Sequence, residues 1–270
     1  YGVLSLVRGS SDSPVEEAQA APTPCVTTIV TAAEVLPKPA KVTGTGVAGT
    51  LSDGSAQVIA KASKNKEAAW KFLVLGSVGL AFALLGTVLL FASGQGVLGE
   101  EMSALDWTRV LAHASALHPF TVKLAVVFLV VGYGTKAGLA PMHTWKPDAY
   151  REAPSPAGVL MAVGMMNCSL YALLRVHVVS RAVLGPEFSG RLLLGLGLAS
   201  VLVATPFILI QWNLKRLLAY SSIEHVGIMA IGFGLGGEVA TLGALLHMTY
   251  HTFAKPVAFF SAGTLAQLHR

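Results

Sequence analysis

A pattern of histidine and lysine near the end of the chain could carry protons. His247, His251 and Lys255 recur every four residues, which places them on one face of a helix, about 6 Å apart per step. Histidine gains and loses protons near neutral pH, and water can bridge the gaps between such groups. The surrounding stretch is apolar enough to lie in a membrane, where ionisable groups usually have a function. We therefore predict a proton path along this face.

The same histidines could instead bind a metal ion, but only with a third ligand. The glutamate of an HExxH motif is absent between them. Cys25 and Cys168 are far apart and lack CxxC spacing. We expect neither a metal site nor a cofactor.

Lys136 has a similarly apolar setting, between Gly132, Gly134 and Gly138. A charge at the centre of a bilayer costs at least about 2.5 to 3.5 kcal/mol. Such a lysine either snorkels to the membrane surface or faces the protein interior, where it has a function. Because the glycines permit a helix break, we predict that Lys136 faces the interior beside a break and carries protons.

Glu224 and His225 lie near one end of another apolar run. Solvation at the membrane surface would explain them as well as a function would. Adjacent residues on a helix point about 100° apart, so we expect at most one of them to line a path with the histidine and lysine stripe.

The composition indicates where these residues lie. Of 270 residues, 53% are hydrophobic and only 12% are charged, whereas soluble domains carry about a quarter charged residues. The net charge is +5, but the basic residues are scattered at the ends of apolar runs and form no stripe for nucleic acid. The composition is that of an integral membrane protein.

The expected fold class is an all-α polytopic transmembrane helix bundle with about six spans, one or two of them broken. A span needs about 20 apolar residues. The runs are residues 72–92, 121–140, 155–174, 192–210, 217–236 and 239–266. The candidates for a broken span are residues 121–140, near Lys136, and residues 239–266, near Pro256.

Residues 1–66 are rich in Ser, Thr, Ala, Gly and Pro. We expect them to form a low-complexity segment, either disordered or produced by a frame-shifted gene, and we assign the transmembrane domain to residues 67–270. Loops on the side that holds Lys146, Arg151 and Lys215 carry more basic residues, so this side is expected to face the cytoplasm. The nearby Asp148 and Glu152 are expected in a solvated or salt-bridged loop.

Four segments resemble a known family, the antiporter-like membrane subunits of respiratory complex I, Mrp cation/proton antiporters and group 4 membrane-bound hydrogenases. They read GYGTKAGLAPMHTWKPDAYREAPSP, NCSLYALLR, LKRLLAYSSIEHVGIMAIGFGLGG and LLHMTYHTFAKPVAFFSAGTLAQ. The resemblance is greatest to component F of hydrogenase 4. It implies an inverted-repeat antiporter-like fold in which Lys136 is the central lysine of a broken helix. It also implies that His247, His251 and Lys255 link two half-channels along a hydrated axis.

The chain departs from the family pattern at several places. The family has a glutamate on an earlier helix that pairs with the central lysine, and this chain has no counterpart. Lys146 replaces the usual leucine of TWLPDA, and Cys168 follows Asn167 near a position where complex I relatives often have lysine. We expect a partial chain that corresponds to helices six to eleven of about fourteen.

The predicted function is that of a proton-translocating subunit of a membrane-bound hydrogenase or NADH-quinone oxidoreductase complex, without a redox centre of its own. The predicted proton pathway consists of Lys136, Glu224, His225, His247, His251 and Lys255. The expected partners are other membrane-arm subunits, the lipid bilayer and protons or sodium ions, but no nucleic acid, and the expected location is the inner (plasma) membrane. A stand-alone Mrp-type antiporter subunit, a structural scaffold and a non-functional fragment are the alternatives.

Overall fold

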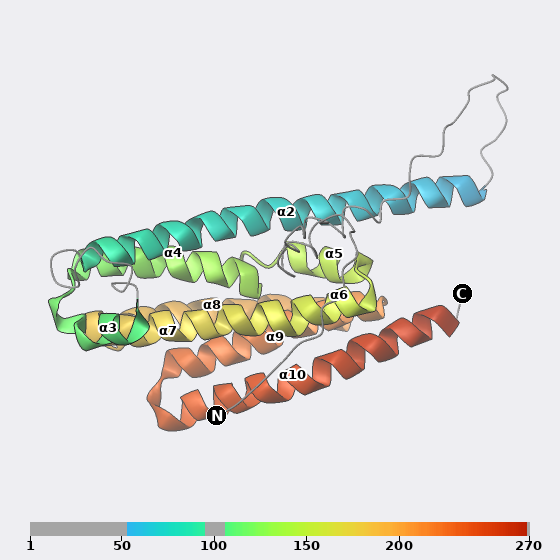
Figure 1. The fold of residues 1–270 in the computed structure, drawn as a ribbon. Coiled ribbons are helices and arrows are strands. Elements are labelled where there is room, and N and C mark those ends of the chain that lie inside the picture. Colours follow the sequence, from blue (N-terminus) through green and yellow to red (C-terminus); the bar gives the residue numbers. More distant parts are fainter. Residues whose placement is uncertain (1–52, 95–105, 269–270) are drawn as a thin grey trace, which may run out of the picture. The chain divides into compact units, whose positions relative to one another are not determined.

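The computed structural model describes residues 53–94 and 106–268, and every regular element within them is a helix (Figure 1). The predicted all-α class is confirmed. In chain order the elements are α2 (Asp53–Ser93), α3 (Trp107–Ala112), the 3-10 turn η2 (Ala114–Ala116), α4 (Pro119–Ala137), α5 (Trp145–Glu152), α6 (Ser155–Val159), the π-helical segment η3 (Leu160–Met165), α7 (Met166–Leu184), α8 (Glu187–Leu209), α9 (Leu214–Leu235) and α10 (Gly237–Leu268).

In the described part of the chain, five stretches are long and apolar enough to cross a membrane. They are Asn65–Ser93, Pro119–Ala137, Ser155–Leu184, Glu187–Leu209 and Leu214–Leu235, and they coincide with the first five predicted runs. The sixth run forms α10, which has 32 residues but is not among the five. These helices fit a multi-pass membrane protein.

Helix α2 begins ahead of the assigned transmembrane domain. Residues 53–66 belong to this helix, although the sequence places them in the low-complexity segment. Residues 1–52, the remainder of that segment, lie outside the described residues. The domain boundary at residue 67 therefore stays a prediction.

The second predicted span breaks where expected. Helix α4 ends at Ala137, and Gly138 follows with φ 83°, a left-handed conformation that suits glycine. The chain becomes helical again at Trp145. Two side chains of α5 satisfy carbonyl groups at the end of α4: Trp145 Nε1 donates to Thr135 O at 2.9 Å, and Lys146 Nζ donates to Ala137 O at 2.7 Å. Carbonyl groups freed at the break therefore find hydrogen-bond donors inside the protein, as backbone groups in a membrane must.

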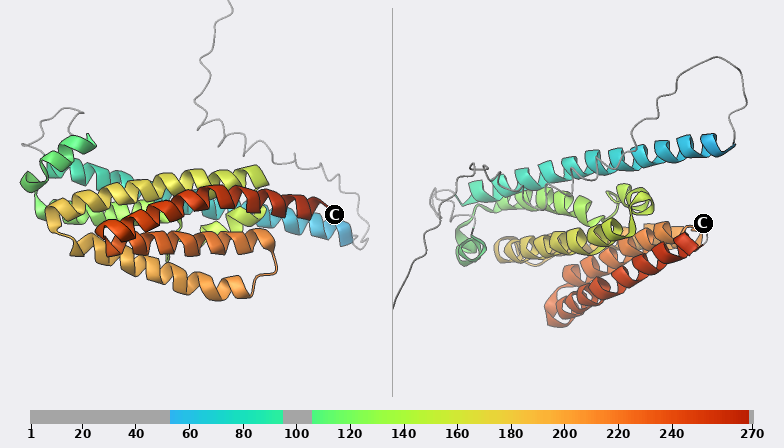
Figure 2. Two further views of the ribbon diagram at one scale, coloured as in Figure 1. Left: turned by 90° about the horizontal axis from the view of Figure 1, so that it is seen from below. Right: turned by 45° about the vertical axis from the view of Figure 1, so that its right-hand side comes forward.

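Of the two candidate breaks, the one near Pro256 does not form. Helix α10 runs through Pro256 without interruption, as both views of Figure 2 show. Proline removes one backbone donor from a helix, and neighbouring groups in a helix bundle can compensate for that loss.

A departure from regular α-helix that we did not predict occurs in the third span, where η3 is π-helical between α6 and α7. Such segments often occur at functional sites.

Small residues allow the helices to approach closely. At Gly132 on α4, an added Cβ would lie 2.5 Å from the backbone nitrogen of Ala83 on α2. At Gly197 on α8, it would lie 2.7 Å from the carbonyl oxygen of Gly227 on α9. Close packing at small residues is how transmembrane helices associate without a hydrophobic driving force.

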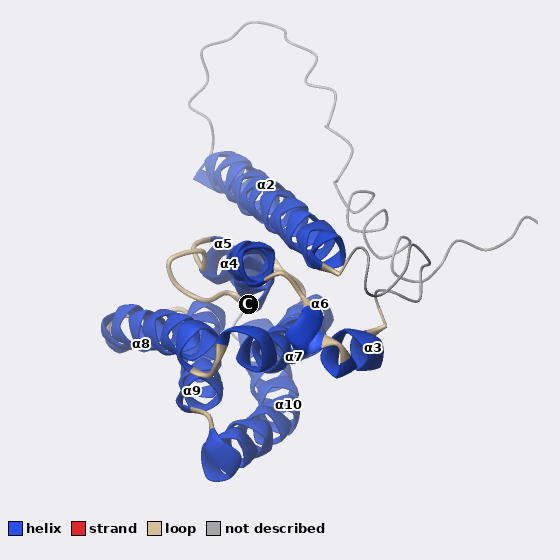
Figure 3. Cartoon of the chain, turned by 90° about the vertical axis from the view of Figure 1, so that its left-hand side faces the viewer, coloured by secondary structure: helices blue, strands red, loops and turns tan. Residues whose placement is uncertain are grey.

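Helix α5 is short but packs against both α2 and α9. Viewed along the helices, α4 and α5 lie between α2 on one side and α9 on the other (Figure 3). The Trp145 ring packs on Phe72 of α2 with centroids 5.2 Å apart, and the Tyr150 ring packs on Phe259 of α10 at 5.6 Å. The segment after the break thus connects the lysine end of α4 with α9 and α10.

Candidate functional site

Histidines from two helices meet between α9 and α10. His225 Nδ1 lies 2.9 Å from His247 Nε2, so one ring donates a hydrogen bond and the other accepts it. The His225 ring is also 5.4 Å from the His251 ring, centroid to centroid. The structure therefore joins two members of the predicted α10 stripe to a histidine of α9.

His251 lies deepest in this cluster, with 2% of its surface exposed. Neither of its ring nitrogens has a hydrogen-bond partner among the described residues, and the same is true of the buried Asn167 Oδ1 on α7. The amide of Asn167 donates to Thr252 Oγ1, one residue beyond His251, at 2.7 Å. Buried polar atoms are normally paired, with ordered water where protein groups are lacking. This part of the helix face is suited to hold water.

Lys255 ends the stripe and is 4% exposed. Its Nζ donates to Ser221 Oγ at 2.9 Å and to Leu218 O at 3.3 Å, both on α9. The Glu224 carboxylate attracts it electrostatically. His225 thus contacts the stripe directly, through His247, whereas Glu224 acts on Lys255 through its charge. The expectation that at most one of them lines a path stays a prediction.

Lys136 lies in the last turn of α4 and faces α2. Its Nζ is 5.5 Å from the centre of the Phe72 ring, and an added Cβ at Gly76 would lie 3.4 Å from the same atom. Both neighbours belong to α2, so the side chain points between two packed helices beside the break. Its role as a proton carrier stays a prediction.

Lys146 is the residue that the sequence analysis missed. It was assigned to a cytoplasmic loop, but it lies on α5 and is completely buried. Its Nζ donates to Ala137 O and is 5.7 Å from the centre of the Tyr150 ring. Burial first, and the positive charge of Lys255 second, lower the pKa of Lys146 to about 7. The available signal was the lysine in place of the leucine that the related motif usually has.

An ion cluster connects α5 to its neighbours on the same side. Asp148 Oδ2 accepts from Lys71 Nζ of α2 at 2.9 Å, and Asp148 Oδ1 lies 3.8 Å from Arg216 Nη2 of α9. The expected ion pairs are present, but they lie on a helix and not in a loop. Because all three side chains are partly exposed, the pairs contribute little stability.

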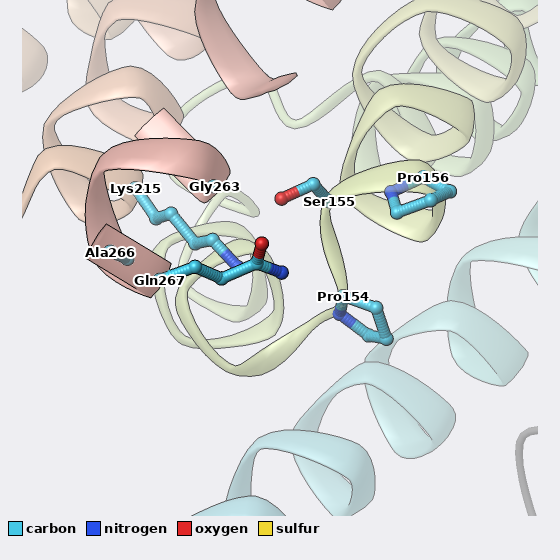
Figure 4. A pocket seen from close by; sticks show the side chains of 7 residues that line it. All are labelled: Pro154, Ser155, Pro156, Lys215, Gly263, Ala266 and Gln267. Atoms are coloured by element: carbon cyan, nitrogen blue, oxygen red, sulfur yellow. The ribbon is translucent and has the colours of Figure 1, made fainter. Parts of the chain in front are cut away.

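A pocket of about 250 Å³ lies near the C-terminal end of α10. Figure 4 shows the side chains of Ser155, Lys215 and Gln267 directed toward it from three segments. None of the predicted pathway residues lines it. Within the described ranges, no group of three or more His, Cys, Asp or Glu residues is placed to hold a metal ion. The histidine and lysine cluster is therefore the candidate site.

Comparisons with known proteins agree with the membrane fold. The model of the family NADH:quinone oxidoreductase/Mrp antiporter, TM, matches residues 56–269. The chain is 41% identical over 221 residues to the Hydrogenase-4 component F homolog of Methylacidiphilum infernorum (isolate V4), over 82% of this chain and 46% of the relative. It is 35% identical over 197 residues to NADH-quinone oxidoreductase subunit N of Desulforudis audaxviator (strain MP104C), over 73% of this chain and 38% of the relative.

A solved structure has a similar fold. A chain of the membrane-bound sulfane sulfur reductase, an archaeal respiratory membrane complex, matches with a TM-score of 0.66 and 31% identity, over 76% of this chain and 40% of that chain. The protein therefore belongs to the NADH:quinone oxidoreductase/Mrp antiporter transmembrane family, and the suspected resemblance is confirmed. The chain spans less than half the length of these relatives.

Proposed function

We propose that this chain is part of a proton-translocating membrane subunit of a hydrogenase or NADH-quinone oxidoreductase type complex. The proposed pathway comprises Lys136, Glu224, His225, His247, His251 and Lys255. The hydrogenase type is favoured because the relative with 41% identity is a hydrogenase-4 component F homolog. The partners would be other membrane-arm subunits, and the location would be the plasma membrane.

The observation that carries this proposal is the contact between His225 and His247, next to His251 and Lys255. The two rings share a hydrogen bond of 2.9 Å, and His251 is buried with unpaired nitrogens. Imidazole can accept a proton on one nitrogen and release one from the other. Lys255 ends the series with an amine held by a hydroxyl and a carbonyl of α9. The arrangement suits stepwise proton transfer along the α9–α10 interface, with water between groups.

The test is proton uptake by sealed membrane vesicles that contain the complex with its full-length subunit. Uptake is followed with a pH-sensitive dye, while electron transfer is measured in the same sample. Lys136→Ala and Lys255→Ala should each abolish uptake and leave assembly largely intact, because alanine has no titratable group and favours helix. His247→Ala should reduce uptake less, since water can fill the gap left by the ring.

The arginine variant is the sharpest control for Lys136. Arginine keeps the positive charge but cannot release its proton, because its pKa lies above about 12. Lys136→Arg should therefore fail almost as fully as Lys136→Ala. Full proton uptake by Lys136→Arg would show that the residue acts as a fixed charge, and the proposed carrier role would be abandoned.

A further inference from the structure

Lys146 places another amine between the two ends of the proposed pathway. On one side its Nζ donates to the carbonyl of Ala137, the residue next to Lys136, at 2.7 Å. On the other side its charge interacts with those of Lys255 and His251. Helix α5, which carries Lys146, packs against two helices. One is α2, which Lys136 faces, and the other is α9, which accepts the hydrogen bonds of Lys255. The Lys146 side chain thus contacts the residue next to Lys136 and also interacts electrostatically with Lys255.

The surroundings of Lys146 do not suit a permanent cation. An ammonium has three N–H donors, and in the described part of the chain Ala137 O is the one acceptor for them. The space beside Nζ is tight, since an added Cβ at Gly138 would lie 3.0 Å from it. The Tyr150 ring, with its centre 5.7 Å away, offers a cation–π contact but no further hydrogen-bond acceptor. A neutral amine needs fewer partners and has a lone pair that can accept a proton. The site therefore suits an amine that exchanges between both forms.

A purely structural role is the simpler alternative, because a basic side chain at the carboxyl end of a helix stabilises its last carbonyl groups. The chain offers a comparison in Lys215, whose Nζ donates to Ala153 O, just after α5, at 2.9 Å. That contact is only partly buried, so the Lys215 charge stays near solvent. Lys146 makes the same kind of contact with its side chain completely buried. Burial at this cost would be unnecessary for capping alone.

We propose that Lys146 is a proton-carrying residue that passes protons between Lys136 and the Lys255 end of the α10 stripe. This inference depends on the proposed function. Each step moves one proton from a protonated amine to a neutral amine or imidazole, directly or through water, so no bond to carbon changes and no oxidant or reductant is needed. The pKa of about 7 for Lys146 agrees with such an exchange.

The test uses Lys146→Leu, Lys146→Gln and Lys146→Arg in the full-length subunit within its complex. Proton uptake per electron transferred is measured in sealed vesicles with a pH-sensitive dye, and assembly is checked by native gel. All three variants should lose at least tenfold in uptake per electron. Glutamine keeps a donor for Ala137 O but cannot titrate, so it covers the case in which the leucine variant does not assemble. Lys215→Leu is the matched control and should pump like the unmodified complex.

Several outcomes would overturn the inference. Normal uptake by Lys146→Gln would show that the hydrogen bond to Ala137 suffices, and normal uptake by Lys146→Arg would show that a fixed cation suffices. An equal loss in Lys215→Leu would show that the assay reports helix ends in general. If Lys136→Ala abolishes uptake while the Lys146 variants pump, only this inference fails. If Lys136→Ala itself pumps, the proposed function fails first.

Discussion

Replacing Gly132 by alanine should push α2 away from α4. The added Cβ would lie 2.5 Å from the nitrogen of Ala83, which falls 0.9 Å short of the 3.4 Å at which ordinary contact begins. It would also lie 2.7 Å from the carbonyl oxygen of Gly79. Both atoms belong to the backbone of α2, so no side chain can rotate away. The helices must separate by close to an ångström, or the backbone must bend.

The size of the effect follows from two opposing terms. Overpacking of this kind costs about 1 to 3 kcal/mol, whereas alanine gains up to about 1 kcal/mol over glycine inside a helix. Gly195 on α8 separates these terms, because an added Cβ there meets nothing within 4 Å. Gly195→Ala should therefore gain the helix propensity of alanine without a steric clash. The two variants should therefore differ in unfolding free energy by about 1 to 3 kcal/mol, with Gly132→Ala less stable.

The measurement is equilibrium unfolding of the purified full-length subunit in mixed detergent micelles with increasing SDS, followed by circular dichroism. Both variants and the unmodified protein are compared in the same detergent. Equal stability of Gly132→Ala and Gly195→Ala would refute the close approach of α2 and α4, and with it the placement of Lys136 between these helices.

Two further substitutions test how α4 and α5 are held. Ser200→Ala removes the Oγ atom that accepts a hydrogen bond of 2.8 Å from the buried Ala140 N–H, beside the helix break. SDS unfolding should show that the unfolding free energy falls by about 1 to 3 kcal/mol. An unchanged midpoint would mean that this amide has another partner. Asp148→Asn should cost less than about 1 kcal/mol by the same measurement, because its pairs with Lys71 and Arg216 are partly exposed; a larger loss would show that the ion cluster is the main attachment of α5.

Much of the architecture could be predicted because it depends on local composition. Long apolar runs with few charges indicate membrane helices, and five of the predicted runs coincide with helices long enough to cross a membrane. Glycines on both sides of Lys136 predicted the end of α4, since glycine readily adopts the left-handed conformation that Gly138 has. The four-residue spacing of His247, His251 and Lys255 placed them on one face, because helix geometry alone sets that face.

The neighbours of each face were decided only by the tertiary structure. Periodicity shows which residues share a side of a helix, but packing between distant segments determines what covers that side. Helix α9 brings His225 against His247 and Ser221 against Lys255, contacts between residues 22 and 34 positions apart in the chain. The continuity of α10 through Pro256 likewise depends on its neighbours and could not be read from the proline.

Lys146 shows this difference most clearly. In the sequence it is a lysine beside a proline in a polar stretch, which is typical of a cytoplasmic loop. In the structure α5, which follows the break after α4, packs against α2 and α9, and the side chain becomes completely buried against Ala137 and Gly138. Local sequence indicated the break after α4, whereas the direction that the chain takes afterwards depends on the surfaces available to cover it.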